Sequence, residues 1–426
     1  MIKILISSLI FFFFNLSLHA QPNILLIISD DQRYDQMKFM PKIKQRIFNQ
    51  GVSYKNAYIT TSACCPSRAS IFTGLYSKNH AVLGNNDSLT VPTVFQAMSS
   101  TYYNGLIGKY LNTSNGQPKP EFDYWDSYAG GNTDYKRPIM NRNGTWIQHN
   151  NHIINVMRDS AIDFLNQANA QSKPFFLTVA INAPHRPSIP RVEERGTLNN
   201  LAFRLPKNFN DSSRSASWVR NLKRPHVGLT KRSMQMKAET LLGFDKGLDA
   251  ILDHVQILNK MADTIIIYLS DNGIHFGEKG LMEKDTPYEE SVRVPFAIRW
   301  DNGILNKRVS GQLVSNIDIA PTISNLTNVP LLATTDGIDI TNSLWNNYKT
   351  RTHLYHQGLG KVIRRKPYYA VRTNNLLLIK WLGVKNNYEF FNYKKDRLLM
   401  NNLYNTGYER LSQRKLIRKL RHYINN

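Results

Sequence analysis

The chain contains two cysteines, which lie side by side at the start of the run Cys64–Gly74, CCPSRASIFTG. Adjacent cysteines make a strained disulfide, because a disulfide normally joins Cα atoms that are further apart. An unpaired cysteine is ordinarily a buried thiol, a partner for another chain or a nucleophile. None of these roles explains the proline and the arginine that follow Cys64 at short, regular spacing. The run therefore points to special chemistry at Cys64.

Four side chains with oxygen ligands follow two apolar runs of the sequence. Asp30 and Asp31 follow the first run, and Asp271 and Asn272 follow the second. Carboxylate and amide oxygens select a hard cation such as calcium or magnesium. One carboxylate at the end of a strand is usually a cap or an ion-pair partner, but two such clusters are harder to explain in that way. The sequence therefore predicts a metal site that includes these four residues.

The pattern Cys-x-Pro-x-Arg followed by Thr-Gly resembles the signature of the type I sulfatases. The resemblance implies that Cys64 is oxidised to Cα-formylglycine by a formylglycine-generating or sulfatase-maturating enzyme. It also implies one calcium ion per chain, bound by the four oxygen ligands and by the formylglycine at Cys64. One hydroxyl of the hydrated aldehyde would attack sulfur, and the other would release sulfate as the aldehyde re-forms, which is covalent catalysis with a built-in release step.

Further residues match positions of the same family. Arg68 lies in the cysteine motif, Lys109 in the segment GKYLN, Lys284 in EKDTPYEE and His185 in APHRP. The resemblance implies that Lys109, Lys284 and His185 hold the ester together with the metal, and that His185 protonates the leaving alcohol. Arg68 would bind the aldehyde hydrate or the ligating carboxylates through its fork of donors. Asp271 is then a candidate base for the attacking hydroxyl as well as a metal ligand.

One position departs from the family pattern. Many arylsulfatases have a histidine two residues after the first lysine, where this chain has Leu111. In the family that histidine deprotonates the second hydroxyl during sulfate release. His80 or His275 is a candidate replacement. The motifs around Cys64, His80 and Leu111 look like those of the glucosamine-6-sulfatase and heparan endosulfatase branch.

The elements that must position these residues can be predicted from the apolar runs. Residues 23–29, 174–181 and 264–270 are continuous apolar runs, which suit parallel strands covered on both faces. Helical stretches such as residues 153–166 and 231–255 separate them, and this alternation predicts a doubly wound sheet with ligands beyond its carboxyl ends. The resemblance implies an alkaline-phosphatase-like mixed sheet sandwiched by helices.

Three regions are expected along the chain. Residues 1–20 carry Lys3 and a long apolar run, which predicts a secretory signal peptide, with an uncleaved membrane anchor as the alternative. Residues 21–345 are expected to form the catalytic domain. Residues 346–426 are expected to form a smaller subdomain of short antiparallel strands and a basic helix. No other stretch is long and apolar enough to span a bilayer, so we expect a periplasmic or secreted protein without stable membrane insertion.

The net charge of the chain indicates what kind of partner it binds. Lys and Arg total 54 against 31 acidic residues, which gives a net charge of +23 and attracts polyanions in general. No zinc pattern, basic zipper or RNA-binding signature accompanies this charge, so a nucleic-acid partner is not expected. A sulfated polysaccharide fits better, and a basic surface that serves only solubility is the other interpretation.

Together these patterns predict hydrolysis of sulfate esters on a sulfated polysaccharide or its oligosaccharides. The glycan could be algal, such as ulvan or carrageenan, or a glycosaminoglycan. One alternative is a phosphatase or phosphodiesterase of the same superfamily, which would use Ser or Thr as nucleophile, usually with zinc. Another is a non-catalytic polyanion-binding protein.

Overall fold

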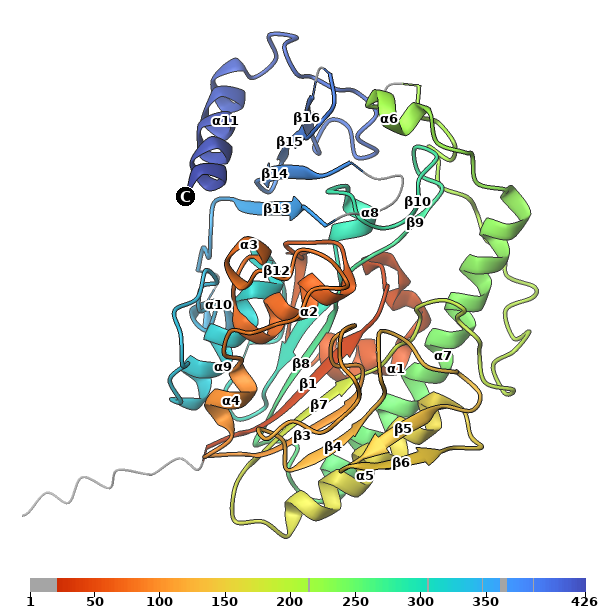
Figure 1. The fold of residues 1–426 in the computed structure, drawn as a ribbon, viewed down its shortest axis with the longest axis vertical. Coiled ribbons are helices and arrows are strands. Elements are labelled where there is room, and N and C mark those ends of the chain that lie inside the picture. Colours follow the sequence, from red (N-terminus) through yellow and green to blue (C-terminus); the bar gives the residue numbers. More distant parts are fainter. Residues whose placement is uncertain (1–20, 214, 305, 347, 361–365, 386) are drawn as a thin grey trace, which may run out of the picture.

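The computed structural model describes residues 21–426 apart from 214, 305, 347, 361–365 and 386. The predicted signal peptide, residues 1–20, lies outside the described residues. The described chain forms a large sheet enclosed by helices and a smaller sheet near the C-terminus (Figure 1). Within it, every helix is too short or too polar to cross a membrane.

Ten strands of the described chain form the large sheet. Their order across the sheet is β12 (Arg308–Ser315), β2 (Val52–Tyr58), β11 (Phe296–Arg299), β8 (Thr264–Ser270), β1 (Asn23–Ser29), β7 (Phe175–Ala180), β3 (Tyr103–Gly108), β4 (Tyr124–Ser127), β5 (Ile139–Arg142) and β6 (Thr145–Gln148). The five strands from β8 to β4 are parallel, whereas β11, β5 and β6 pair antiparallel with their neighbours. The sheet is therefore mixed, as predicted.

Helices lie on both faces of this sheet (Figure 1). The α-helices are α1 (Pro41–Ile43), α2 (Cys64–Thr73), α3 (Ser77–His80), α4 (Val94–Met98), α5 (Ile153–Asn169), α6 (Ser217–Arg220), α7 (Val227–Ile257), α8 (Glu289–Val292), α9 (Ile319–Thr327), α10 (Asn342–Trp345) and α11 (Arg410–Asn425). Three further short helical segments are η1 (Tyr34–Phe39), η2 (Lys44–Phe48) and η3 (Asn316–Asp318).

The core shows why the β1 sequence is apolar without interruption. Leu25 packs on one face, in a cluster that includes Phe164 of α5 and Leu248 of α7. Leu26 packs on the opposite face, in a cluster that includes Phe72 of α2. Because both faces of the strand are covered, neither side of β1 can carry a polar residue without burying it. The predicted doubly wound sheet sandwiched by helices is confirmed.

A smaller antiparallel sheet follows in the C-terminal part. It consists of β13 (Leu354–Gly358), β14 (Tyr368–Arg372), β15 (Leu376–Trp381) and β16 (Tyr388–Asn392). Helix α11 packs Leu416 and Leu420 against one face of this sheet, and the other face packs Trp381 against Trp218. The antiparallel sheet with a basic helix is confirmed, although β13 was not expected from the sequence. A boundary after residue 345 stays a prediction.

The strands β9 (His275–Phe276) and β10 (Met282–Glu283) form a separate antiparallel pair. This hairpin follows β8 directly, and the chain then continues into α8 (Figure 1). It therefore carries Lys284 back toward the carboxyl edge of the large sheet.

Candidate active site

Parallel strand ends bring the predicted residues to one edge of the large sheet. β1 and β8 pair in register up to their last residues, so Asp30 and Asp271 leave the sheet at the same level. β7 and β3 run parallel beside them, and the loops that follow carry His185 and Lys109 to the same edge. The edge therefore collects residues that are far apart in the sequence.

Cys64 is the first residue of α2, a position where a helix favours anions. Its side chain is buried, and its Sγ lies 3.4 Å from Asp30 Oδ1 and 2.8 Å from Lys284 Nζ. Burial, reinforced by the charge of Asp30, raises the pKa of the Cys64 thiol to about 12. The thiol is then protonated at neutral pH, and a protonated thiol is a weak nucleophile. The environment therefore does not suit papain-type catalysis by an unmodified cysteine.

Six ionised groups share this buried cluster, and their formal charges cancel. The three carboxylates and three cations are Asp30, Asp31, Asp271, Arg68, Lys109 and Lys284. Buried charges are tolerated when they are paired and hydrogen-bonded. A divalent cation added to this balanced set would leave a net positive charge, which attracts an anionic ester.

Each carboxylate has a particular cation partner. Asp30 accepts a bond from Lys109 Nζ at 2.5 Å, and Asp31 accepts one from Lys284 Nζ at 2.5 Å. Burial favours the neutral form of Asp31, but the neighbouring cations, Lys284 foremost, together outweigh it and lower the pKa of Asp31 to about 2. Burial and the charge of Asp30 raise the pKa of Asp271.

Within the cluster, Arg68 is fully buried. Its Nε donates to Asp271 Oδ2 at 2.8 Å, and its Nη1 donates to the carbonyl oxygen of Lys109 at 2.9 Å. Its Nη2 lies 3.6 Å from Asp30 Oδ2. The guanidinium group therefore holds the ends of β1, β3 and β8 together.

Lys109 depends on the glycine before it. Gly108 has a φ of 94°, and a Cβ there would lie 2.3 Å from the carbonyl oxygen of Ala180 on the neighbouring strand. Only glycine accepts both conditions without strain. The turn sends Lys109 inward, where its ammonium group is fully buried against Asp30.

The arrangement fits a hard cation. Ligand atoms of Asp30, Asp31, Cys64 and His185 all lie within 4.8 Å of one another. Asp31 Oδ2 is buried and has no hydrogen-bond partner among the described residues. The Nδ2 of Asn272 donates to the other oxygen of Asp31 at 2.6 Å, so the Asn272 amide lies beside the same carboxylate. A buried acceptor with no donor, surrounded by further oxygen ligands, is what a calcium ion requires.

A cavity of about 590 Å³ opens beside this cluster. Cys64, His185 and Lys284 line it, together with the amides Asn85 and Asn112. Asp30, Arg68, Lys109 and Asp271 do not line it and lie behind its wall. A substrate in the cavity would therefore meet Cys64, His185 and Lys284 directly.

His185 is partly exposed at the cavity. Its Nδ1 bonds the carbonyl oxygen of Arg186 at 2.8 Å, and its Nε2 lies 3.8 Å from Asp31 Oδ2. A carbonyl oxygen only accepts hydrogen bonds, so Nδ1 carries a proton. Nε2 is then the ring atom that can exchange a proton with a bound molecule.

The two candidate replacement histidines do not line this cavity. His80 is held by Ser70 Oγ, 3.0 Å from its Nε2, and its Nδ1 accepts from the Val82 amide at 3.1 Å. Burial lowers the pKa of His80 to about 4. His275 bonds Thr286 Oγ1 at 2.7 Å through its Nε2. Both rings thus have structural contacts.

The leucine at the family histidine position also has a structural role. The side chain of Leu111 is 3% exposed and belongs to the apolar core that includes Phe72 and Phe122. It packs away from the charged cluster, so this position does not offer a polar group to the cavity. Asn112, the next residue, lines the cavity instead.

Two positioning residues were not predicted from the sequence. Tyr135 donates its hydroxyl to the carbonyl oxygens of Asn182 and His185, at 2.9 and 2.6 Å. Lys237 of α7 is buried and donates to the carbonyl oxygen of Pro184 at 2.6 Å. Both hold the loop that carries His185. A tyrosine and a lysine outside any motif carry no signal in a single sequence, so only the structure identifies them.

Comparison with known proteins shows the family of this chain. Residues 22–329 match the sulfatase family model, and residues 277–426 match the C-terminal model of N-sulphoglucosamine sulphohydrolase. The chain is 32% identical to the extracellular sulfatase SULF-1 homolog of Drosophila melanogaster, over 76% of this chain and 31% of that protein. It is 25% identical to the N-acetylglucosamine-6-O-sulfatase of Bacteroides thetaiotaomicron, over 94% of this chain and 86% of that protein.

A solved structure shares the fold. It is the structure of a protein in complex with its substrate D-glucosamine-2-N,6-O-disulfate, with a TM-score of 0.84 at 23% identity, and the match covers 95% of this chain and 97% of that chain. The chain spans only about a third to two thirds of the length of the first curated relatives that it matches.

Proposed function

Because the chain belongs to the sulfatase family, we propose that it hydrolyses sulfate esters with Cα-formylglycine formed at Cys64 and a calcium ion bound beside it. The observation that carries this proposal is the position of Cys64. Its side chain lies at the start of α2, between Asp30 and Lys284, and lines a cavity. A maturation enzyme of the host would install the formylglycine.

The proposed metal ligands are Asp30, Asp31, Asp271, Asn272 and the modified Cys64. When bound, calcium would act as a Lewis acid that polarises the sulfate group and favours ionisation of the attacking hydroxyl. The hydrated aldehyde at Cys64 would supply that hydroxyl and a second one that releases sulfate.

The other residues have roles that follow from their positions. Lys284 faces the cavity beside Cys64, so its ammonium group would bind a sulfate oxygen. His185 would give a proton from Nε2 to the leaving alcohol oxygen, since its Nδ1 stays bound to a carbonyl. Lys109 would act through Asp30, because it lies behind the wall of the cavity and keeps that carboxylate ionised.

The proposed substrate is a sulfated polysaccharide or an oligosaccharide derived from it. The net charge of +23 favours an anionic polymer, and relatives over most of this chain carry the names of carbohydrate sulfatases. Glycosaminoglycans and algal glycans both fit this description. We also propose a periplasmic or secreted location, because the relative from Drosophila is named as an extracellular sulfatase.

The test combines mass spectrometry with turnover. The full chain is produced in a host that installs formylglycine, the peptide containing Cys64 is weighed, and sulfate release is measured on a panel of sulfated glycans. We expect a converted Cys64 and release that a calcium chelator abolishes. A converted protein that turns over aryl phosphates but not sulfate esters would instead establish the phosphatase alternative.

A further inference from the structure

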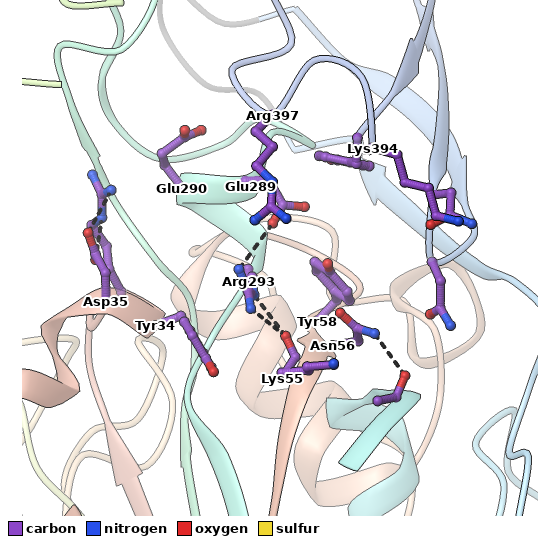
Figure 2. Close-up of a pocket in the computed structure, with 15 residues that line it drawn as sticks. Tyr34, Asp35, Lys55, Asn56, Tyr58, Glu289, Glu290, Arg293, Lys394 and Arg397 are labelled. Carbon is purple, nitrogen blue, oxygen red and sulfur yellow. Dashed lines mark hydrogen bonds and ion pairs between the residues drawn. The ribbon is translucent and has the colours of Figure 1, made fainter. Parts of the chain in front are cut away.

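A second cavity lies between β2, α8 and the C-terminal sheet. It has a volume of about 780 Å³ and shares no lining residue with the cavity at Cys64. Its walls come from η1, β2, α8 and the loops of the C-terminal sheet, as Figure 2 shows. Gly311 of β12 also lines it, so segments that are far apart in the sequence build the cavity, and none of its residues has a part in the proposed reaction.

The lining has an excess of positive charge. Five basic and three acidic side chains line the cavity. Lys55 of β2 and Lys394 and Arg397 of the loop after β16 form no ion pair within the described chain. A basic side chain that is exposed at a cavity and has no carboxylate partner is available to an anionic group of a ligand.

Aromatic rings stand beside these charges. Arg293 lies 3.9 Å from the ring centre of Tyr34, and the buried Arg372 lies 3.7 Å from that of Tyr58. Stacking on cations fixes these rings, because the guanidinium groups lie over their faces. Tyr34, Tyr58 and Tyr393 all line the cavity. Fixed aromatic surfaces with polar edges suit a ligand that has both apolar and polar faces.

Acceptors and amides complete the lining. Asp35 and Glu290 offer carboxylate oxygens, and Asn56, Asn374 and Asn375 offer amides. A sugar ring has hydroxyls that donate to such carboxylates. A DNA strand has no hydroxyl along its backbone that could donate to these carboxylates. The mixture therefore favours an anionic carbohydrate over nucleic acid.

The second cavity is close to the first along two stretches of chain. Asp31 belongs to the proposed metal site, and Arg33, two residues later, lines the second cavity. Lys284 lines the first cavity and Glu289 lines the second, and an extended chain of five residues spans at most about 18 Å. A ligand of several sugar units is therefore long enough to reach both.

From these observations we propose that the second cavity is a docking site for an anionic segment of the glycan chain, separate from the site of sulfate hydrolysis. Lys55, Lys394 and Arg397 bind sulfate or carboxylate groups there, and the partly exposed Tyr34 and Tyr393 contact the sugar rings. This inference rests on the proposed function for the identity of the polymer, but docking itself requires no turnover.

The test measures binding in the full chain with Cys64→Ala, so that no sulfate is released. Size-defined heparin oligosaccharides are titrated by calorimetry into this protein and into a form that adds Lys55→Gln, Lys394→Gln and Arg397→Gln. Loss of charge-assisted bonds should raise the Kd of long oligosaccharides by about tenfold or more. A disaccharide cannot reach both cavities, so its Kd should rise less.

A matched control removes the same number and types of charge elsewhere. Lys415, Arg418 and Lys419 are exposed on α11 and form no ion pair within the described residues, so their exchange to Gln should leave the Kd within about twofold. Equal weakening by both triple variants would show that only net charge matters and would overturn the proposal. The proposal would also be overturned if duplex DNA bound as tightly as the long oligosaccharides and lost as much affinity in the cavity variant. That result would indicate a nucleic-acid site. Failure of the converted enzyme to release sulfate is a separate result, which would reject the proposed function alone.

Discussion

Replacing Arg68 by leucine would leave two buried carboxylates without their guanidinium partner. Arg68 is fully buried, and its Nε bonds Asp271 Oδ2 at 2.8 Å. Its second carboxylate contact, with Asp30, is longer at 3.6 Å, and Asp30 keeps the bond from Lys109. Most of the effect should therefore come from Asp271.

The expected size follows from the cost of an unpaired buried charge. Removing one partner of a buried ion pair costs about 3–5 kcal/mol. Against a total stability of about 5–15 kcal/mol, Arg68→Leu should lower the urea midpoint strongly. Adding Asp271→Asn removes the orphaned charge, so the double variant should be more stable than Arg68→Leu by about 1–3 kcal/mol.

The assay is urea unfolding followed by tryptophan fluorescence, with a chelator present so that metal binding does not contribute. Arg68→Lys is the matched control, because it keeps the charge but loses the fork of donors, and we expect an intermediate loss. A loss below about 1 kcal/mol in Arg68→Leu would refute the reasoning. So would a double variant no more stable than Arg68→Leu, since that result would mean that the two groups do not interact.

Three further outcomes are expected. His185→Gln should lower kcat by about 100-fold or more on alkyl sulfates and much less on aryl sulfates with good leaving groups, as measured by steady-state kinetics, and an equal loss on both would contradict a proton donor. In the urea assay without the chelator, calcium at about 100 times its Kd should stabilise the chain by about 2.7 kcal/mol, and equal midpoints with calcium and with chelator would count against the metal site. Burial, with the charge of Glu278, raises the pKa of Glu290 to about 7, while Arg33 opposes this shift and His275 lies 3.9 Å away. A carboxyl group with a raised pKa contributes stability below about pH 4.5, and this contribution is lost as the pH rises through 7. Glu290→Gln should therefore be more stable than the parent at pH 8 and not at pH 4. Parallel profiles of unfolding free energy against pH for the two proteins would disprove this.

The sequence alone determined the strands and the reactive motif, because both are local. β1 and β8 are continuous apolar runs rich in isoleucine, and runs of this length and composition favour a strand buried on both faces. The position of Asp30 and Asp271 at the strand ends followed from the same runs. The cysteine motif identified Cys64 and Arg68 through their spacing, which needs no knowledge of the rest of the chain.

The tertiary structure decided which side chains face the cavity. Lys109 and Lys284 both lie in family motifs, so the sequence does not distinguish them. In the structure Lys109 lies behind Asp30, whereas Lys284 lines the cavity. Leu111 was noticed as a departure, but its burial in the core could not be seen from its neighbours in the sequence. His80 and His275 were candidates by residue type, and their bonds to Ser70 and Thr286 depend on how helices and loops pack.

The physical reason is the distance along the chain between groups that touch. Asp31 and Lys284 are 253 residues apart in sequence, and their ion pair exists only because β1 and the hairpin after β8 end at the same edge. Sequence pattern specifies what each segment buries, whereas the partner of a buried charge depends on the relative placement of segments. The second cavity, with walls from segments far apart in the sequence, could be found only in the folded chain.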